Sequence, residues 1–83
     1  MEYKSVPGVI LTSVCGHYYL VNPGETIEIN ETAVFYWNLL CEGATEEELA
    51  ELAGRQYDID DMELLRMDVQ TLVALLKERH MIS

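Results

Sequence analysis

The sequence is poor in the features that mark secreted, membrane-spanning or disulfide-stabilised proteins. It contains only two cysteines in 83 residues, too few for a disulfide framework. No apolar run approaches the ~20 residues that cross a bilayer, and the start, "MEYKSVPG", has neither the basic nor the apolar stretch of a signal peptide. With 49% hydrophobic residues, the composition is that of a globular protein. We therefore expect a single cytoplasmic domain, residues 1–83, that does not contact membranes.

Metal ligands and catalytic groups are also scarce. Cys15, His17, Cys41 and His80 lack the paired spacing of a metal site, so we expect a turn cysteine at 15, a partly buried one at 41, and no metal. The serines have no nucleophile motif around them. The five glycines fall where turns or helix ends are expected, and none belongs to a phosphate-binding loop. The sequence therefore predicts a protein that is not an enzyme and needs no cofactor.

Basic residues are few, and the acidic ones are clustered. Five Lys and Arg against fifteen Asp and Glu give a net charge of −10. Residues 42–63, called the acidic segment below, have one base, Arg55, and nine acids, for a charge of −8: Glu42, Glu46, Glu47, Glu48, Glu51, Asp58, Asp60, Asp61 and Glu63. Such a charge repels a phosphate backbone and attracts cationic peptides or protein faces, unless the acids serve only solubility. Nucleic acid is therefore not an expected partner.

The first third of the chain has the pattern of an antiparallel sheet. Three runs rich in β-branched and aromatic residues or alternating in polarity predict strands at 9–14, 17–21 and 26–29. Cys15-Gly16 is expected at the tip of the first hairpin. Asn22-Pro23-Gly24-Glu25 predicts a turn with a positive φ at Gly24. In such a meander the first and third strands are both edges, which raises the question of what pairs with the third, "ETIEIN".

Two helices follow, each with a recognisable start and end. Asn30 is a good N-cap for the first, and Gly43 a good C-terminal residue. Thr45 and Glu48 form a capping box for the second, which is expected to end near Gly54. The apolar stripes of these two helices are expected to be formed by Ala33, Val34, Phe35, Tyr36, Trp37, Leu39, Leu40 and Cys41, and by Leu49, Leu52 and Ala53. The loop 55–60 is expected to be anchored by Tyr57.

A third helix is expected from a cap at Asp60 or Asp61 to about Arg79, after which Met81-Ile82 could tuck back onto the sheet. Its core stripe comprises Leu65, Val69, Leu72, Val73 and Leu76. A flanking stripe is apolar at both ends and polar in the middle: Leu64, Asp68, Thr71 and Leu75. That pattern fits either the wall of a groove or a border with solvent. The fold class expected is α+β and winged-helix-like, with a three-stranded antiparallel sheet followed by three helices.

Three stretches carry a resemblance to a known family. "YYLVNPGETIEINETAVFYWNLL", "EGATEEELAELAGRQY" and "MDVQTLVALLKERHMI" together match, in order and spacing, the strand-turn-strand-helix, G-x-T-x-x-E-L and D-V-x-x-L-V-x-x-L elements of the PqqD-like proteins. The chain resembles these peptide-recognition domains from roughly Val9 to Ile82. Members of this family serve pathways that make ribosomally synthesised, post-translationally modified peptides.

The resemblance implies a module that binds the leader segment of a precursor peptide and delivers it to a separate modifying enzyme or leader peptidase. In the family, the leader adds as an antiparallel strand to the third strand, in a groove walled by the third helix; β-augmentation of this kind uses the open backbone groups of an edge. Carried over residue by residue, the peptide-binding residues are Glu25, Thr26, Ile27, Glu28, Ile29, Leu64, Asp68, Thr71 and Leu75. Asp68 is the one expected to make a polar or charge-assisted contact with the leader.

The resemblance also suggests a discrete protein acting in trans, as in lasso-peptide pathways, although other pathways use free-standing members too. The acidic segment would face either the leader or the partner enzyme. Two alternatives remain from the residues themselves. One is a winged-helix DNA-binding regulator, which would need a basic recognition helix, whereas the basic residues here are sparse and scattered. The other is an acidic scaffold subunit that binds no peptide.

Overall fold

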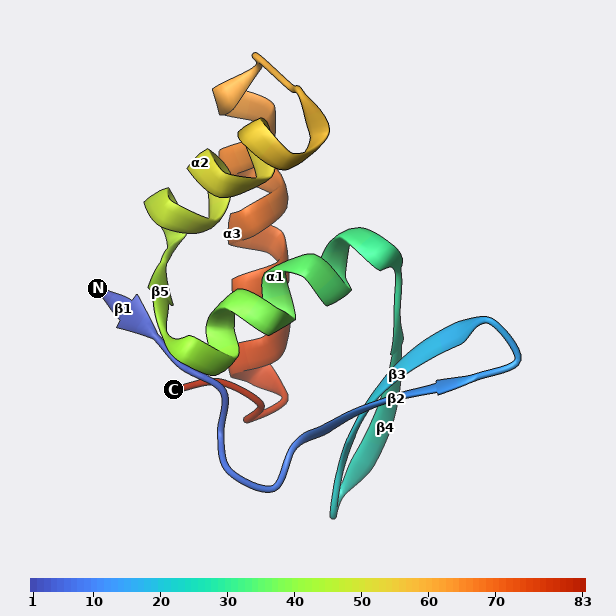
Figure 1. Cartoon of the computed structure of the whole chain (residues 1–83). Coiled ribbons are helices and arrows are strands. Elements are labelled where there is room, and N and C mark those ends of the chain that lie inside the picture. The colour runs from blue at the N-terminus through green and yellow to red at the C-terminus, as the bar shows by residue number, and fades with distance from the viewer.

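The computed structural model describes residues 1–83 and has the expected α+β architecture. The elements in chain order are β1 (Glu2–Tyr3), β2 (Ile10–Val14), β3 (His17–Asn22), β4 (Glu25–Ile29), α1 (Glu31–Glu42), β5 (Ala44–Thr45), α2 (Glu46–Tyr57) and α3 (Met62–Glu78). Figure 1 shows the three helices gathered on one side and the β2-β3-β4 sheet projecting from them on the other. The sheet and three-helix arrangement predicted from the sequence is therefore confirmed.

The main sheet is an antiparallel meander in the order β2-β3-β4, so β4 has a partner on one side only. The predicted turn between β3 and β4 is present, but Gly24 does not have the expected positive φ. The turn is held by the side chain of Asn22, whose Oδ1 accepts hydrogen bonds from the backbone N–H groups of Gly24 and Glu25, each at 2.8 Å. Because the asparagine side chain closes the turn, a left-handed glycine is not required there.

A second, two-stranded sheet was not predicted. β1 pairs with β5, joining Tyr3 to Ala44, and Figure 1 shows both termini beside it. Met81 and Ile82 are buried, as expected of a tail that folds back. They pair with the N-terminal segment and not with the main sheet: the N–H of Val6 donates to the carbonyl of Met81 at 2.9 Å, and Ser5 forms a bridge with Ile82.

The helix starts agree with the sequence signals. The side chains of Asn30 and Asp61 accept hydrogen bonds from the backbone near the starts of α1 and α3, and Thr45 and Glu48 form the predicted capping box. The predicted end of α2 near Gly54 is wrong, since the helix continues to Tyr57. Gly54 instead permits close packing, because a Cβ there would lie 3.2 Å from the carbonyl oxygen of Ile59 and 3.3 Å from Leu65 Cδ1.

One core lies between the helices and the near face of the sheet. Its fifteen buried residues are Leu20, Ile29, Tyr36, Trp37, Leu40, Ala44, Leu49, Ala50, Ala53, Leu65, Val69, Val73, Leu76, Met81 and Ile82. Three expectations are corrected: Cys41 and Leu52 are exposed, and Tyr57 belongs to α2 and not to a loop. Tyr57 is held by an edge-to-face contact with Phe35, with ring centroids 5.5 Å apart. Fewer residues of α1 and α2 therefore pack against the core than the sequence predicted, since Cys41 and Leu52 face solvent.

Candidate functional site

The open edge of β4 is the first element of the site. Side chains along this strand alternate as predicted, because Ile27 is half-buried and Ile29 buried while Thr26 and Glu28 are exposed. No other segment pairs with the far side of the strand. An edge of this kind presents unpaired N–H and C=O groups that another strand can bond.

The register identifies which backbone groups of β4 face outward. Cys15 and Gly16 have φ values of 51° and 81°, as in the two-residue turns whose flanking pair is hydrogen-bonded. Along β3, beginning at that flanking pair, successive residues form their backbone hydrogen bonds in turn with β2 and with β4. The β4 residues opposite those that bond to β4 are Ile27 and Ile29, so the N–H and C=O groups of these two residues point inward to β3. It follows that the N–H and C=O groups of Thr26 and Glu28 point to the open edge.

α3 provides the second element, a row of exposed side chains. Leu64, Asp68, Thr71 and Leu75 are all exposed, as the flanking-stripe pattern indicated. The structure brings three of them, Asp68, Thr71 and Leu75, into one pocket and leaves Leu64 outside it, with half of its surface exposed. Three residues of the flanking stripe therefore line a pocket, and the fourth, at the N-terminal end of the stripe, lies outside it.

The pocket lies between the first half of α1 and the middle of α3, and its volume is about 340 Å³. It is lined by Asn30, Thr32, Ala33, Tyr36, Asp68, Thr71, Leu72 and Leu75. None of the five β4 residues lines it, but Asn30 follows directly after Ile29. The pocket therefore begins where the open edge ends, and a chain laid along β4 would run into it.

Tyr36 was interpreted from the sequence only as a core residue of α1. Only 2% of its surface is exposed, its hydroxyl has no hydrogen-bond partner, and it lines the pocket. Burial raises the pKa of the phenol above its ordinary value of 10.0, and the negative charges of Asp68 and of ionised Tyr57 add to the shift. Buried hydroxyls usually have a partner. Helical periodicity can place this ring in the core but cannot show that its hydroxyl is unpaired.

Asp68 has neither an ion pair nor a hydrogen bond within the chain. The three arginines are each paired with a glutamate elsewhere, in the pairs Arg55–Glu51, Arg66–Glu47 and Arg79–Glu25. Lys77 lies over the ring of Tyr3, with Nζ 5.4 Å from its centroid. The one charged side chain in the pocket is therefore a carboxylate without a compensating cation.

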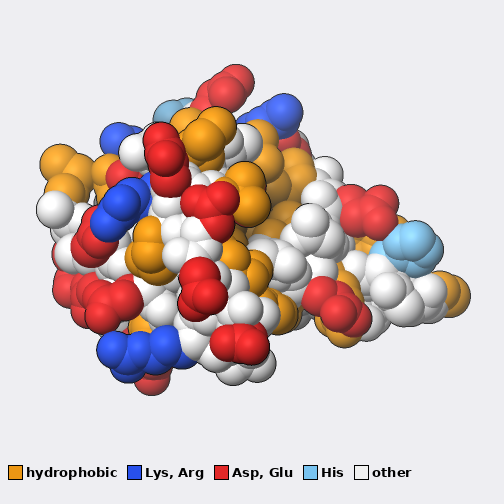
Figure 2. All heavy atoms as spheres, turned by 90° about the horizontal axis from the view of Figure 1, so that it is seen from above, with side chains coloured by type: hydrophobic (Ala, Val, Ile, Leu, Met, Phe, Trp, Pro, Cys, Tyr) orange, Lys and Arg blue, Asp and Glu red, His pale blue; other side chains and the backbone are white.

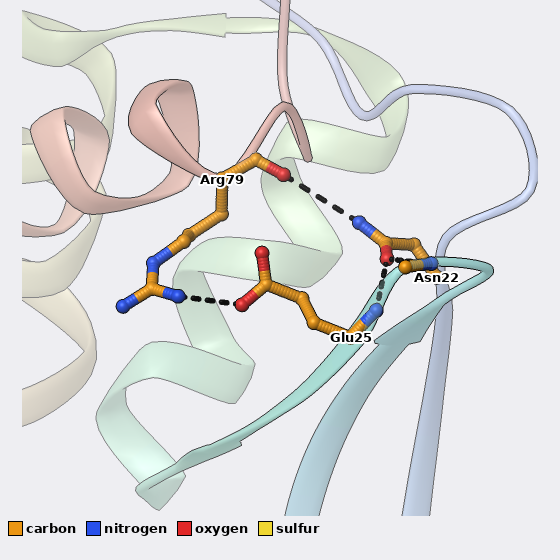
Figure 3. A network of polar contacts seen from close by, with 4 residues as sticks. Asn22, Glu25 and Arg79 are labelled. Atoms are coloured by element: carbon orange, nitrogen blue, oxygen red, sulfur yellow. Dashed lines mark hydrogen bonds and ion pairs between the residues drawn. The ribbon is translucent and has the colours of Figure 1, made fainter.

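The start of β4 is fastened to the end of α3. In Figure 3 the guanidinium of Arg79 points toward Glu25, and Nη1 lies 2.6 Å from Oε1. The amide of Asn22 also donates to the backbone carbonyl of Arg79, at 3.5 Å. These contacts hold the strand and the helix together at the end away from Asp68, and they engage the Glu25 side chain within the protein.

The acidic segment lies over the helical part of the molecule. Figure 2 shows red side chains spread over this face, with few blue ones between them. Several of the acids have local roles: Glu48 closes the capping box, Glu51 pairs with Arg55, and Glu47 pairs with Arg66. The Arg66 guanidinium lowers the pKa of Glu47 through its hydrogen bond and its charge. Part of the acidic excess therefore stabilises α2 and its packing on α3.

No three His, Cys, Asp or Glu side chains gather where they could hold a metal ion. No helix has the length and apolar character that a membrane span requires.

His17 contacts Glu28 across the outer face of the sheet, with Nδ1 2.7 Å from Oε2. The Glu28 side chain, next to the open edge, is therefore already in contact with His17.

Comparisons with known proteins agree with this architecture. Residues 11–82 match the family described as Coenzyme PQQ synthesis protein D (PqqD). The PqqD truncation of Methylobacterium extorquens PqqCD, a functional and stand-alone recognition element for ribosomally synthesised and post-translationally modified peptides, has a similar structure. Its TM-score is 0.82 at 21% identity, over 99% of this chain and 88% of that one.

Lasso peptide synthetase B1, solved in complex with the leader peptide, is similar as well, with a TM-score of 0.81 at 22% identity over 100% of this chain and 99% of that one. At such identities the two likenesses show a shared fold. No curated protein matches in sequence. The family match, by contrast, extends over most of the chain and confirms the resemblance found in its motifs, so this chain belongs to the PqqD family.

Proposed function

We propose that this protein binds the leader segment of a ribosomally synthesised precursor peptide as an additional antiparallel strand on β4. The observation that carries the proposal is the open β4 edge, which leads directly into a pocket walled by α3. Backbone bonds to the outward groups of Thr26 and Glu28 would supply sequence-independent affinity. The pocket and the exposed row on α3 would supply selectivity among side chains.

The proposed peptide-binding residues are the β4 strand, Glu25 to Ile29, with Leu64, Asp68, Thr71 and Leu75 of α3. Their proposed roles differ. Thr26 and Glu28 turn their backbone groups to the open edge, whereas Ile27 and Ile29 bond to β3 and turn their side chains to the core. Asp68, Thr71 and Leu75 present side chains to the pocket, where the leader would be read.

The similar proteins support a role as an adaptor without catalytic activity. One is a stand-alone recognition element, and the other is a lasso peptide synthetase B1 in complex with the leader peptide. On this basis the protein would act in trans in the cytoplasm, in lasso-peptide or similar natural-product biosynthesis. It would deliver the bound precursor to a separate modifying enzyme or leader peptidase, and no cofactor would be needed.

The two alternatives differ in their support. A DNA-binding regulator is disfavoured by membership of the PqqD family and by a net charge of −10, which repels the phosphate backbone. A scaffold that binds no peptide is disfavoured by the open edge, which a pure scaffold has no reason to keep uncovered beside a pocket.

The direct test is fluorescence anisotropy with a labelled leader peptide from the precursor gene beside this gene, at low and high salt. Duplex DNA of similar size serves as the control ligand. Saturable binding of the peptide without binding of DNA is the expected result. If the peptide does not bind and the partner enzyme does, the scaffold function is correct instead.

A further inference from the structure

Two side chains of the pocket between α1 and α3 are notable for polar groups without partners, one because it is buried and the other because it is charged. The Tyr36 hydroxyl is buried with no hydrogen bond in the chain, and Asp68 has neither a hydrogen bond nor an ion pair. The neighbouring Thr71 hydroxyl is already engaged, since it donates to the carbonyl of Met67 at 2.9 Å. A buried hydroxyl without a partner costs free energy; this oxygen has almost no accessible surface of its own, although Tyr36 is one of the residues that line the pocket.

The two unpaired groups call for the same kind of partner. A carboxylate only accepts hydrogen bonds, and a phenol hydroxyl can accept one from a cation. No Lys or Arg of the chain lines the pocket to fill this role. The charge of Asp68 reaches the phenol, since it helps to raise the Tyr36 pKa, yet the two groups form no hydrogen bond with each other. Tyr36 and Asp68 line the same pocket, so a ligand group that enters it meets both residues.

The rest of the pocket lining limits what that group is attached to. Ala33, Leu72 and Leu75 provide an apolar wall beside the polar groups. Lys and Arg bury an apolar stem and keep a charged head among polar partners. A wholly apolar side chain would leave the carboxylate and the hydroxyl desolvated and unpaired, and an acidic one would be repelled by Asp68.

Building on the proposed function, we infer that this pocket selects a Lys or Arg side chain of the leader, whose head bonds to Asp68 and Tyr36 and whose stem lies on Leu72 and Leu75. The pocket lies past the C-terminal end of β4, next to Asn30. An antiparallel strand on β4 has its N-terminal end at that point. The basic residue therefore lies at the N-terminal border of the paired leader segment.

The test is a double-mutant cycle with synthetic leader peptides from the neighbouring precursor gene. Each Lys or Arg of the leader is replaced in turn by norleucine, which keeps an apolar stem and removes the charge. Binding is measured by anisotropy to the parent protein and to the variants Asp68→Asn and Tyr36→Phe. Glu78→Gln, an exposed acid on α3 outside the pocket, is the matched control.

One norleucine peptide is expected to bind the parent and Glu78→Gln about tenfold more weakly than the unmodified leader, the loss typical of one charge-assisted hydrogen bond. With the Asp68→Asn variant, the same norleucine replacement should lower the affinity by about twofold or less, since the carboxylate that would bind the basic residue is already absent. The inference is wrong if no basic position behaves in this way, or if the loss is equal for the parent and Asp68→Asn. If no leader binds the parent at all, the proposed function fails as well, so the two failures are distinguishable.

Discussion

The sheet has two open edges, and they differ in their surroundings. On β2, Ile10 and Val14 are 62% and 55% exposed, and the strand ends at a hairpin tip that projects from the helices. On β4, the side chains alternate between core and solvent, and the strand leads through Asn30 into the pocket against α3. Both edges offer unpaired backbone groups, but only β4 leads into the pocket that contains Tyr36 and Asp68; the second hollow, which adjoins the start of β2, is lined by Val9 and His80 among others.

An open edge is therefore not by itself a binding site. Backbone groups attract any extended chain, including another copy of the same protein. Selectivity needs side chains that contact those of the added strand, and in the proposed function α3 supplies these along β4. Variants of the two edges and of α3 can distinguish binding by the edge alone from binding by the edge together with the helix.

The largest loss of leader affinity is expected when the β4 edge is blocked by a proline. In Glu28→Pro the lost N–H points to the open side, so the bond to β3 remains while pairing with a leader is blocked. We expect a loss of affinity of about 2 kcal/mol or more, about thirtyfold, in anisotropy titrations with Glu28→Ala as the control for loss of the same side chain.

The matched change on the other edge is Ser13→Pro, because the same alternation of bonds turns the N–H of Ser13 away from β3. We expect it to leave leader affinity within about twofold of the parent, which is the usual range for a site that does not touch the ligand. Equal losses from both prolines, with folding retained, would show that the two edges are not functionally different.

The next largest effect is expected from the α3 wall. Leu75→Glu places a charge in the apolar part of the pocket, and Asp68→Ala removes the carboxylate; each should weaken leader binding by about 1–2 kcal/mol. Both side chains are exposed in the free protein, so the circular dichroism spectrum should not change. Leader affinities equal to that of the parent would remove α3 from the site.

The Tyr36→Phe variant is expected to have a smaller effect, which weakens leader binding but does not lower the stability of the fold. Removing an unpaired buried hydroxyl should leave the free energy of unfolding unchanged or raise it by up to about 1 kcal/mol, measured by urea denaturation. The same change should weaken leader binding severalfold. A clear loss of stability would mean that the hydroxyl is satisfied, for example by a bound water, and serves the fold instead.

The same tyrosine predicts a dependence of stability on alkaline pH. Burial raises its pKa in the folded protein above the ordinary value of 10.0, so the unfolded chain loses this proton first. The contribution of the protonated Tyr36 to the free energy of unfolding is therefore fully present below pH 10. It is lost as the pH rises through the pKa of Tyr36 in the folded protein. Urea denaturation between pH 9 and 11.5 should show a steeper decline for the parent than for Tyr36→Phe.

The smallest effect is expected at the far end of the groove. Arg79→Ala removes the contact with Glu25, and because both side chains are partly exposed it should lower stability by only about 0.5 kcal/mol. Leader affinity should fall about twofold, since the strand and α3 are less firmly joined, as measured by thermal unfolding and anisotropy. A loss as large as that of Leu75→Glu would indicate direct contact of Arg79 with the peptide.

Much of this fold could be predicted from local signals. The hairpin at Cys15-Gly16, the capping box at Thr45 and the cap at Asp61 each depend on residues within a few positions of one another. The flanking stripe on α3 was also visible, because helical spacing decides which residues share a face. These features need no knowledge of the distant chain.

The features that were missed depend on distant contacts. The pairing of β1 with β5 joins segments more than forty residues apart and involves two residues in each strand. Gly54 suggested a helix end, but its role is to let α2 pack closely on α3. The unpaired hydroxyl of Tyr36 could not be inferred either, since its lack of a partner depends on what every neighbouring element places around it.

The most direct test of the central claim is backbone amide hydrogen exchange, followed by NMR with and without the leader peptide. The account predicts that the N–H groups of Thr26 and Glu28 exchange freely in the free protein and become protected when the leader binds, while those of Leu11 and Ser13 on the β2 edge do not change. Binding of the leader without protection at Thr26 and Glu28, or with protection along β2, would contradict it.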